Sequence, residues 1–246
     1  AGATVKPASK VTAHAEFVGG GFGSKFSIGP EVQLAAKVSE KLGRPCRVVL
    51  DRREDHLDGG NRPGSIQYMK IAVDKNGKLL GGRIHCASAV GYNGGAGGIQ
   101  NPNYYDFGEI VKTSEDIVLN AGQGKAFRAP GYPPGTFALE SMLDELAAAT
   151  GMDPVEFRKK NETSDRRIKQ LDQGAELIGW KDRRPDGARS GRIKRGYGCA
   201  GASWGNSQGR CEVDCDIYRN GELELRIGIQ DIGTGAKVLP VDVAAY

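Results

Sequence analysis

The chain has 246 residues, which is enough for one large domain or for two of ordinary size with buried cores. Hydrophobic residues make up 39% and charged residues 26%, as in an ordinary water-soluble globular protein, and no apolar run approaches the roughly 20 residues of a membrane span. Five cysteines, an odd number without regular spacing, argue against a disulfide scaffold and favour a reducing compartment. Cys211 and Cys215, four residues apart in an alternating strand pattern, are either a metal-binding pair or packed thiols.

The net charge of +4 is concentrated in one basic segment. Residues 158–195 contain 13 Lys or Arg against 6 Asp or Glu. A nucleic-acid surface would interleave aromatic side chains with such charges, and this segment contains only Trp180. We therefore expect a solvated connecting segment and no nucleic-acid partner.

The first part of the chain is predicted to form a strand, a loop, a helix and a second strand. Apolar residues alternate over residues 10–18, which is typical of a half-buried strand. Residues 31–42 place apolar side chains on one helical face, and Gly43 and Pro45 are helix stop signals. The apolar run at residues 46–50 predicts the second strand.

Two β-hairpins are predicted farther along the chain. Each is centred on an Asn-Gly pair, the strongest short-range hairpin signal. The first spans residues 68–85 around Asn76–Gly77, and the second spans residues 211–229 around Asn220–Gly221.

Helices are predicted between these hairpins. Residues 137–150 repeat leucine and methionine at positions i, i+3, i+4 and i+7 and end at Gly151. Asp153 then caps a short helix that has Pro154 at its first position. We therefore predict an α+β chain of two lobes. Its parts are residues 1–160, a loop-rich basic connecting segment at 161–195, and a second, truncated lobe at 196–246.

The chain contains three glycine-rich loops: residues 19–25 (GGGFGSK), 122–131 (GQGKAFRAPG) and 228–237 (GIQDIGTGAK). Backbone N–H groups in such loops can hold a negative group such as phosphate, although a single glycine loop is more often a turn. The spacing matches neither a P-loop nor the dinucleotide fingerprint. Arg128, in an apolar, proline-flanked loop, is either an anion contact or a structural arginine satisfied by carbonyl groups. Three such loops suggest convergence on one extended polyanionic ligand.

Four motifs together resemble a known family. GGGFGSK, AFRAPG, MDPVEFRKKN and QDIGTG stand here in the order found in the molybdopterin-binding large subunit of the xanthine dehydrogenase/aldehyde oxidase family, the molybdenum hydroxylases. They are most similar to the bacterial aldehyde oxidoreductase-type members, and the resemblance covers nearly the whole chain. It implies the molybdenum hydroxylase large-subunit fold, with mixed sheets, packed helices and two molybdopterin-binding lobes, of which the second is truncated here.

The resemblance also implies which residues contact the cofactor, which is molybdopterin or its cytosine dinucleotide form. The family holds molybdenum through the pterin dithiolene, so no metal-ligating side chain is expected. The implied cofactor-binding residues are Gly20, Gly21, Phe22, Gly23, Ala126, Phe127, Arg128, Gly233, Thr234 and Gly235.

The activity that the resemblance implies is hydroxylation of a carbon centre with oxygen drawn from water. The cofactor performs the redox chemistry, and the protein positions the reactants. Iron–sulfur clusters and FAD are expected on partner subunits or domains. The implied compartment is the cytoplasm, with export to the periplasm alongside a partner subunit as the alternative.

Two departures from the family pattern bear on the substrate. Purine-oxidising members have a glutamate just after the lysine of the first loop, where this chain has Phe26, and no arginine lies between Ile84 and Lys125. An apolar or aromatic aldehyde is therefore expected rather than a purine. Trp204 falls near the family's substrate pocket, and a core tryptophan is the alternative.

The family's catalytic glutamate has no match in this chain. Gly108–Glu109 and Gly221–Glu222 are its Gly-Glu pairs, and neither has the context of that motif, which lies near the C-terminus of a longer subunit. The chain is therefore expected to be an internal fragment without catalytic residues and inactive alone. The rival interpretation is a non-catalytic binding or assembly module of the same fold that lacks the cofactor.

Overall fold

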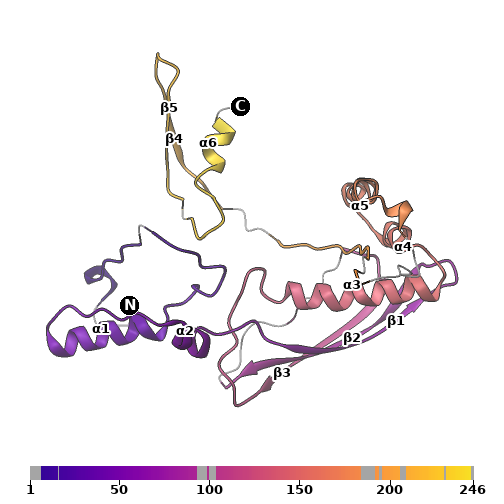
Figure 1. The fold of residues 1–246 in the computed structure, drawn as a ribbon, viewed down its shortest axis with the longest axis horizontal. Helices are drawn as coiled ribbons and strands as arrows, with labels where there is room; N and C mark the ends of the chain where they lie inside the picture. Colours follow the sequence, from indigo (N-terminus) through magenta and orange to yellow (C-terminus); the bar gives the residue numbers. More distant parts are fainter. Residues whose placement is uncertain are drawn as a thin grey trace. The chain divides into compact units, whose positions relative to one another are not determined.

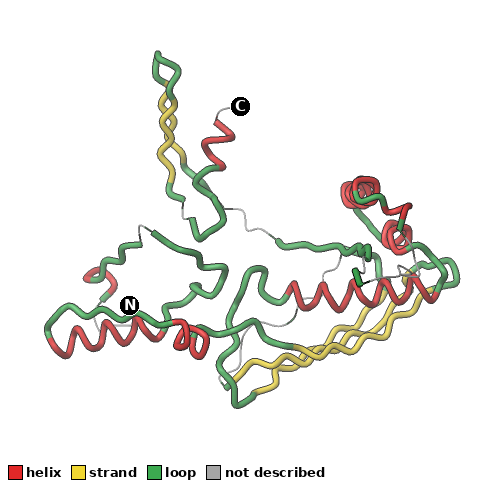
Figure 2. The backbone as a smooth tube through the Cα atoms, viewed as in Figure 1, coloured by secondary structure: helices red, strands yellow, loops and turns green. Residues whose placement is uncertain are grey.

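The computed structural model describes most of the 246 residues (Figures 1 and 2). The described residues are 7–15, 17–92, 99, 104–183, 192–193, 196–205, 209–229 and 231–244. The chain forms two compact units, and three separate stretches of sequence make up the first: Ala1–Arg62, Gly122–Arg128 and Gly205–Tyr246. The second consists of Pro63–Ala121 and Ala129–Trp204. The division of the sequence at residues 160 and 195 stays a prediction.

The second unit is built on a mixed three-stranded sheet (Figure 2). β1 (Ser65–Val73) pairs antiparallel with the central strand β2 (Leu79–Gly91), and β3 (Glu109–Val118) runs parallel to β2. The predicted hairpin at Asn76–Gly77 is confirmed, and the glycine has φ 80° at the turn. β3 was not predicted, because its sequence, EIVKTSEDIV, is largely polar and exposed.

The described residues of this unit also form three α-helices and a 3-10 turn at Trp180–Asp182. α3 (Tyr132–Ala149) runs along the sheet, and α4 (Pro154–Asn161) and α5 (Asp165–Leu177) pack in turn beside its end (Figure 1). α3 begins five residues before the predicted start, after Gly131, which has φ 79°. α5 occupies part of the segment that was expected to be rich in loops. The hydrophobic core of the unit consists of Leu79, Tyr105, Phe107, Leu139, Leu143, Ala147 and Phe157.

A buried charge network joins α3 to α4. The Arg158 side chain is fully buried, and its Nε donates a hydrogen bond to Glu140 at 2.7 Å while Nη1 donates to Asp144 at 2.7 Å. The other oxygen of Glu140 accepts hydrogen bonds from the hydroxyl groups of Tyr104 at 2.9 Å and Tyr105 at 3.0 Å. Burial alone would lower the pKa of the Arg158 guanidinium, but its bonds and the two carboxylate charges raise that pKa overall. The Arg158 guanidinium is therefore held in its charged form, and each of its three nitrogens donates a hydrogen bond.

The motif MDPVEFRKKN, which contains Arg158, is accordingly a structural motif. The Asp153 side chain caps α4 as predicted, by accepting hydrogen bonds from the N–H groups of Val155 and Glu156. The buried Asn161 side chain donates to the Gly77 carbonyl at 2.8 Å and accepts from the Leu79 N–H at 2.9 Å. These bonds attach the end of α4 to the turn between β1 and β2.

The first unit contains short, lightly packed elements. None of the described residues in α1, α2 or α6 is buried. The predicted helix 31–42 and the hairpin at Asn220–Gly221 are confirmed, the former as α1. The elements are α1 (Pro30–Leu42), α2 (Arg52–Asp58), β4 (Val213–Ile217), β5 (Leu223–Ile227), α6 (Leu239–Ala244) and a 3-10 turn at Ala8–Lys10.

The two strands predicted at the start of the chain are wrong. In the described part of residues 10–18, and throughout 46–50, the chain forms no strand. Phe17, expected on a half-buried face, is 94% exposed. A strand needs a ladder partner as well as an alternating pattern, and these segments have none among the described residues.

Cys211 and Cys215 are free and exposed rather than packed. No helix among the described residues combines the length and apolar character that crossing a membrane requires.

We expect Arg158→Met to lower the free energy of unfolding by about 3–5 kcal/mol, because it leaves the buried Glu140 carboxylate without its counter-charge. Urea unfolding followed by circular dichroism measures this change. Arg166→Met, on the exposed surface of the next helix, is the matched control and should change stability by no more than about 0.5 kcal/mol. Equal effects of the two substitutions would contradict a structural role for the network.

The tyrosines of the network predict a loss of stability at alkaline pH. Burial raises the pKa of Tyr104 and Tyr105 well above the usual value, and the charge of Glu140 raises both further. Folded tyrosines therefore keep protons that the unfolded chain releases above about pH 10, so their contribution is complete below that pH and is lost as pH rises toward the folded values. The melting temperature should fall more steeply above this pH in the original protein than in a Tyr104→Phe, Tyr105→Phe variant. Parallel curves would refute the assignment.

Candidate functional site

The three glycine-rich loops contact one another in the first unit. The Gly21 N–H donates a hydrogen bond to the Ile232 carbonyl at 3.0 Å, which joins the first loop to the third. The Arg128 N–H donates to the Phe22 carbonyl at 2.5 Å, which joins the second loop to the first. Backbone bonds thus assemble one surface from segments that lie more than 100 residues apart in the sequence.

Two glycines allow this close approach. Gly23 has φ +98°, and a Cβ built on it would lie 3.3 Å from the carbonyl carbon and oxygen of Ala126. Gly233 has φ +97°, and a Cβ there would lie 3.0 Å from the tip of the Phe22 ring. Both positions combine a positive φ with a neighbouring atom that lies too close for a side chain. Only glycine fits both conditions without strain.

Phe22 itself has a strained backbone. Its φ is 47°, in the left-handed region that a bulky side chain seldom adopts. Such a conformation costs of order 1–3 kcal/mol and persists where surrounding contacts enforce it. Here the Phe22 carbonyl is bonded to Arg128, and its ring lies against Gly20 and Gly233. Strain of this kind is concentrated at functional sites.

The guanidinium of Arg128 is accessible. The residue is exposed, and no described side chain or carbonyl forms a hydrogen bond or an ion pair with its guanidinium. Its backbone, in contrast, is held at both ends, by Phe22 at the N–H and by Arg62 at the carbonyl. Of the two roles considered for Arg128, this geometry supports an anion contact rather than a structural arginine satisfied by carbonyls.

The third loop is closed on itself by an aspartate that the sequence interpretation missed. Asp231 Oδ1 accepts hydrogen bonds from the N–H groups of Gly233 at 2.9 Å, Thr234 at 3.0 Å and Gly235 at 3.2 Å. The Gly233 bond, followed by those of the other amides, lowers the pKa of the Asp231 carboxyl. The amides that were expected to face the cofactor are therefore already paired with a carboxylate.

The two predicted substrate-pocket residues belong to different units. Phe26, in the first unit, is 77% exposed, and its N–H donates to the Gly23 carbonyl at 3.2 Å. Trp204, in the second unit, is 56% exposed and makes an edge contact with Tyr132 at a centroid distance of 5.1 Å. The alternative that Trp204 is a core residue does not hold, because more than half of it is exposed. A role in a substrate pocket stays a prediction for both residues.

The loop surface fits an anionic group. Arg128 presents an exposed guanidinium, and Nη1 of the neighbouring Arg62 is buried without a hydrogen-bond partner among the described residues. A phosphate or another anionic oxygen of molybdopterin is the kind of acceptor that such donors require. Arg62 was missed by sequence reasoning because its neighbour in space, Arg128, lies 66 residues away.

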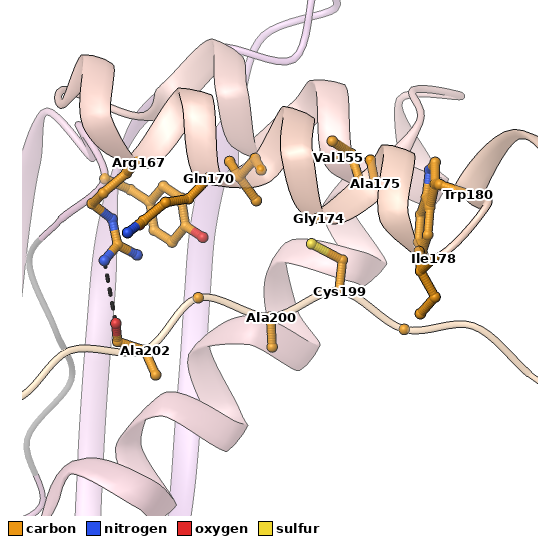
Figure 3. Close-up of a pocket in the computed structure, with 14 residues that line it drawn as sticks. Val155, Arg167, Gln170, Gly174, Ala175, Ile178, Trp180, Cys199, Ala200 and Ala202 are labelled. Carbon is orange, nitrogen blue, oxygen red and sulfur yellow. Dashed lines mark hydrogen bonds between the residues drawn. The ribbon is translucent and has the colours of Figure 1, made fainter.

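A separate cavity of about 320 Å³ lies in the second unit (Figure 3). It is bounded by α5 and by the extended segment 198–202, which Arg167 fastens through a 3.2 Å hydrogen bond to the Ala202 carbonyl. Cys199 points toward α5, and burial raises the pKa of its thiol. None of the predicted cofactor-binding residues lines this cavity.

Known proteins match this chain over most of its length. The family description "Molybdopterin cofactor-binding domain" matches residues 1–162. The aldehyde oxidoreductase molybdenum-binding subunit of Escherichia coli (strain K12) is 30% identical over 260 residues, covering 97% of this chain and 35% of that protein. The xanthine dehydrogenase molybdenum-binding subunit of Escherichia coli O157:H7 is 29% identical over 247 residues, covering 89% of this chain and 33% of that protein. The chain therefore spans about a third of the length of these curated relatives.

Solved structures match the fold as well. The aldehyde oxidoreductase from Desulfovibrio desulfuricans is 25% identical, with a TM-score of 0.61, over 66% of this chain and 20% of that one. The α+β class and the molybdenum hydroxylase large-subunit fold that the motifs implied are thereby confirmed. The chain belongs to the family of molybdopterin-binding subunits of the molybdenum-dependent xanthine dehydrogenases and aldehyde oxidoreductases.

Proposed function

We propose that this chain holds the molybdenum cofactor in the large subunit of an oxidoreductase that hydroxylates aldehydes with oxygen from water. The observation that supports the proposal is the contact of the three glycine loops around the strained Phe22. Family membership supports molybdopterin as the ligand. The name of the Escherichia coli aldehyde oxidoreductase subunit, to which the chain is similar over 97% of its length, supports an aldehyde as the substrate.

Each loop has its own task in this proposal. The first loop, Gly20 to Gly23, presents Phe22 to the cofactor. The second loop, Ala126 to Arg128, presents a guanidinium to its anionic oxygens. The third loop, Gly233 to Gly235, packs Gly233 against the Phe22 ring. Its amides are bonded to Asp231 and so are not assigned to the cofactor. When bound, the cofactor supplies the redox chemistry, and these residues bind and orient it.

The finer features of the proposal follow the family pattern. The cofactor is the cytosine dinucleotide form, and iron–sulfur clusters and FAD lie on partner subunits or domains. Phe26 and Trp204 are each apolar residues available for substrate contact, which suits an aldehyde better than a purine. The catalytic glutamate lies in the part of the relatives' length that this chain does not match, so the chain alone is inactive. The compartment is the cytoplasm, with periplasmic export alongside a partner as the alternative.

The test is metal, pterin and activity analysis of the complete subunit purified with its partners. Near-stoichiometric molybdenum and pterin, together with oxidation of an aromatic aldehyde, would support the proposal. Complete absence of both from a properly matured preparation would instead favour a non-catalytic module of the same fold. Activity on a purine without activity on aldehydes would overturn the substrate assignment.

We expect Arg128→Ala to reduce both the molybdenum content and the activity of the complete enzyme by about tenfold, the effect of losing a charged hydrogen bond. Arg128→Lys should restore only part of the loss, because a point charge cannot reproduce the guanidinium fork. Arg219→Ala, at an exposed arginine in the β4–β5 turn of the same unit, is the control and should retain both properties. Unchanged molybdenum and turnover in Arg128→Ala would refute the role of this arginine.

The first loop also predicts a contrast between two glycines in cofactor-free protein. Gly23→Ala should destabilise the protein by about 1–2 kcal/mol, because its φ is +98° and a methyl group would lie only 3.3 Å from the Ala126 carbonyl. Gly21→Ala should change stability little, because a Cβ there would lie at an ordinary 3.5 Å from the nearest atom, Lys25 Cβ. Thermal unfolding of both variants measures the difference. A larger loss in Gly21→Ala would show that the loop packing described above is incorrect.

A further inference from the structure

Arg62 makes two contacts with the second glycine-rich loop, residues 122–131, which contains Arg128 and is called the arginine loop below. Its Nη2 donates a hydrogen bond to the Arg128 carbonyl at 2.8 Å, and its guanidinium carbon lies 5.1 Å from the centre of the Phe127 ring. The first contact fixes the backbone of the residue whose side chain faces solvent. The second stacks a cation on an aromatic ring, an arrangement that arginine favours.

The backbone beside Arg62 strengthens this attachment. The Asn61 carbonyl accepts a hydrogen bond from the Lys125 N–H at 2.8 Å, and Asn61 forms a parallel bridge with Gly124. The segment after α2 and the segment before Arg128 thus run side by side for a few residues. Pro63 follows at once and restricts the backbone on the other side. Arg62 is therefore held in register with the arginine loop.

One nitrogen of Arg62 has no hydrogen-bond partner in the described part of the chain. Nη1 is buried, and no described residue accepts a hydrogen bond from it or pairs with it in a salt bridge. Arg158, whose side chain is fully buried, uses all three of its nitrogens, whereas Arg62 is only partly buried and leaves this one unbonded. A buried donor without an acceptor is costly, and a charged one more so. Such a group in an otherwise well-fastened side chain indicates an acceptor that comes from outside the protein.

We propose that Arg62 is a positioning residue of the cofactor site whose Nη1 bonds to an anionic oxygen of the bound cofactor, such as a phosphate oxygen. The inference rests on the proposed function, because it takes the ligand of the loops to be the molybdenum cofactor. Arg62 then has two connected roles. It sets the loop that presents Arg128, and it supplies a second guanidinium to the same anion.

The experiment compares Arg62→Met and Arg62→Lys with Arg52→Met in the complete enzyme. Methionine keeps an apolar stem over Phe127 and removes the guanidinium, while Arg52, 81% exposed and paired with Asp55 on α2, is the matched control. Each protein is prepared with cofactor and from a host that cannot make the cofactor. The readouts are molybdenum and pterin per chain, and the rise in melting temperature that cofactor loading produces.

Arg62→Met should contain about tenfold less cofactor and show a smaller rise on loading, the effect of losing a charged hydrogen bond, whereas Arg52→Met should match the original protein in both. Arg62→Lys should lie between them. If Arg62→Met does not fold, the lysine variant decides, because it must still lose cofactor through its missing fork. Arg62→Met could instead match the original protein in cofactor content and in the rise on loading, while its cofactor-free and loaded forms both melt at lower temperature. That result would show that Arg62 has only a structural role, and it would overturn this inference without affecting the proposed function. An original enzyme without molybdenum would overturn the proposed function and this inference with it.

Discussion

The hydrogen bond from the Arg128 N–H to the Phe22 carbonyl is the constraint on which the site depends. It brings together loops that are 106 residues apart in sequence, and it does so at the residue whose backbone has φ 47°. A left-handed phenylalanine relaxes unless several contacts oppose the change. This bond supplies one such contact, and the packing of the ring against Gly233 supplies another. The same few contacts thus fix the backbones of the strained Phe22 and of Arg128. A substitution in one loop should therefore alter the conformation of the others.

The two units differ in how tightly their described residues are packed. The second unit has a continuous core and a buried ion network in which every nitrogen of Arg158 is bonded. The first unit has no buried residue in its described helices, and every residue of β4 is exposed. Segments with few buried contacts open most readily, and they gain most from a ligand that binds the closed form. If the loops bind the cofactor as proposed, their place in the lightly packed unit couples their order to cofactor binding.

Local signals predicted the elements that local chemistry determines. Asn-Gly pairs predicted both hairpins, Gly43 and Pro45 predicted the C-terminal end of α1, and Asp153 with Pro154 predicted the start of α4. The strands expected at 10–18 and 46–50 failed, and the polar strand β3 was missed, because strand formation depends on a partner elsewhere in the chain. For the same reason the motifs pointed to Arg128 but not to Arg62, whose significance lies in a contact with a carbonyl 66 residues away. Asp231 is a different case, because it stands inside the motif QDIGTG and bonds amides two to four residues ahead. An aspartate shortly before Gly-Thr-Gly is a local turn signal that the motif interpretation passed over.

The pairing of Asp231 with the third loop changes how the site recognises an anion. In the sequence, the Gly-Thr-Gly amides were natural donors to a phosphate, but in the folded chain a carboxylate already accepts from all three. A second anion at those amides would have to displace Asp231 against charge repulsion. The guanidinium groups of Arg128 and Arg62 are free of this competition, since no described carboxylate pairs with either. In the proposed function, recognition of the anionic cofactor therefore falls to the arginine loop and to Arg62, while the third loop packs against Phe22 in its strained conformation.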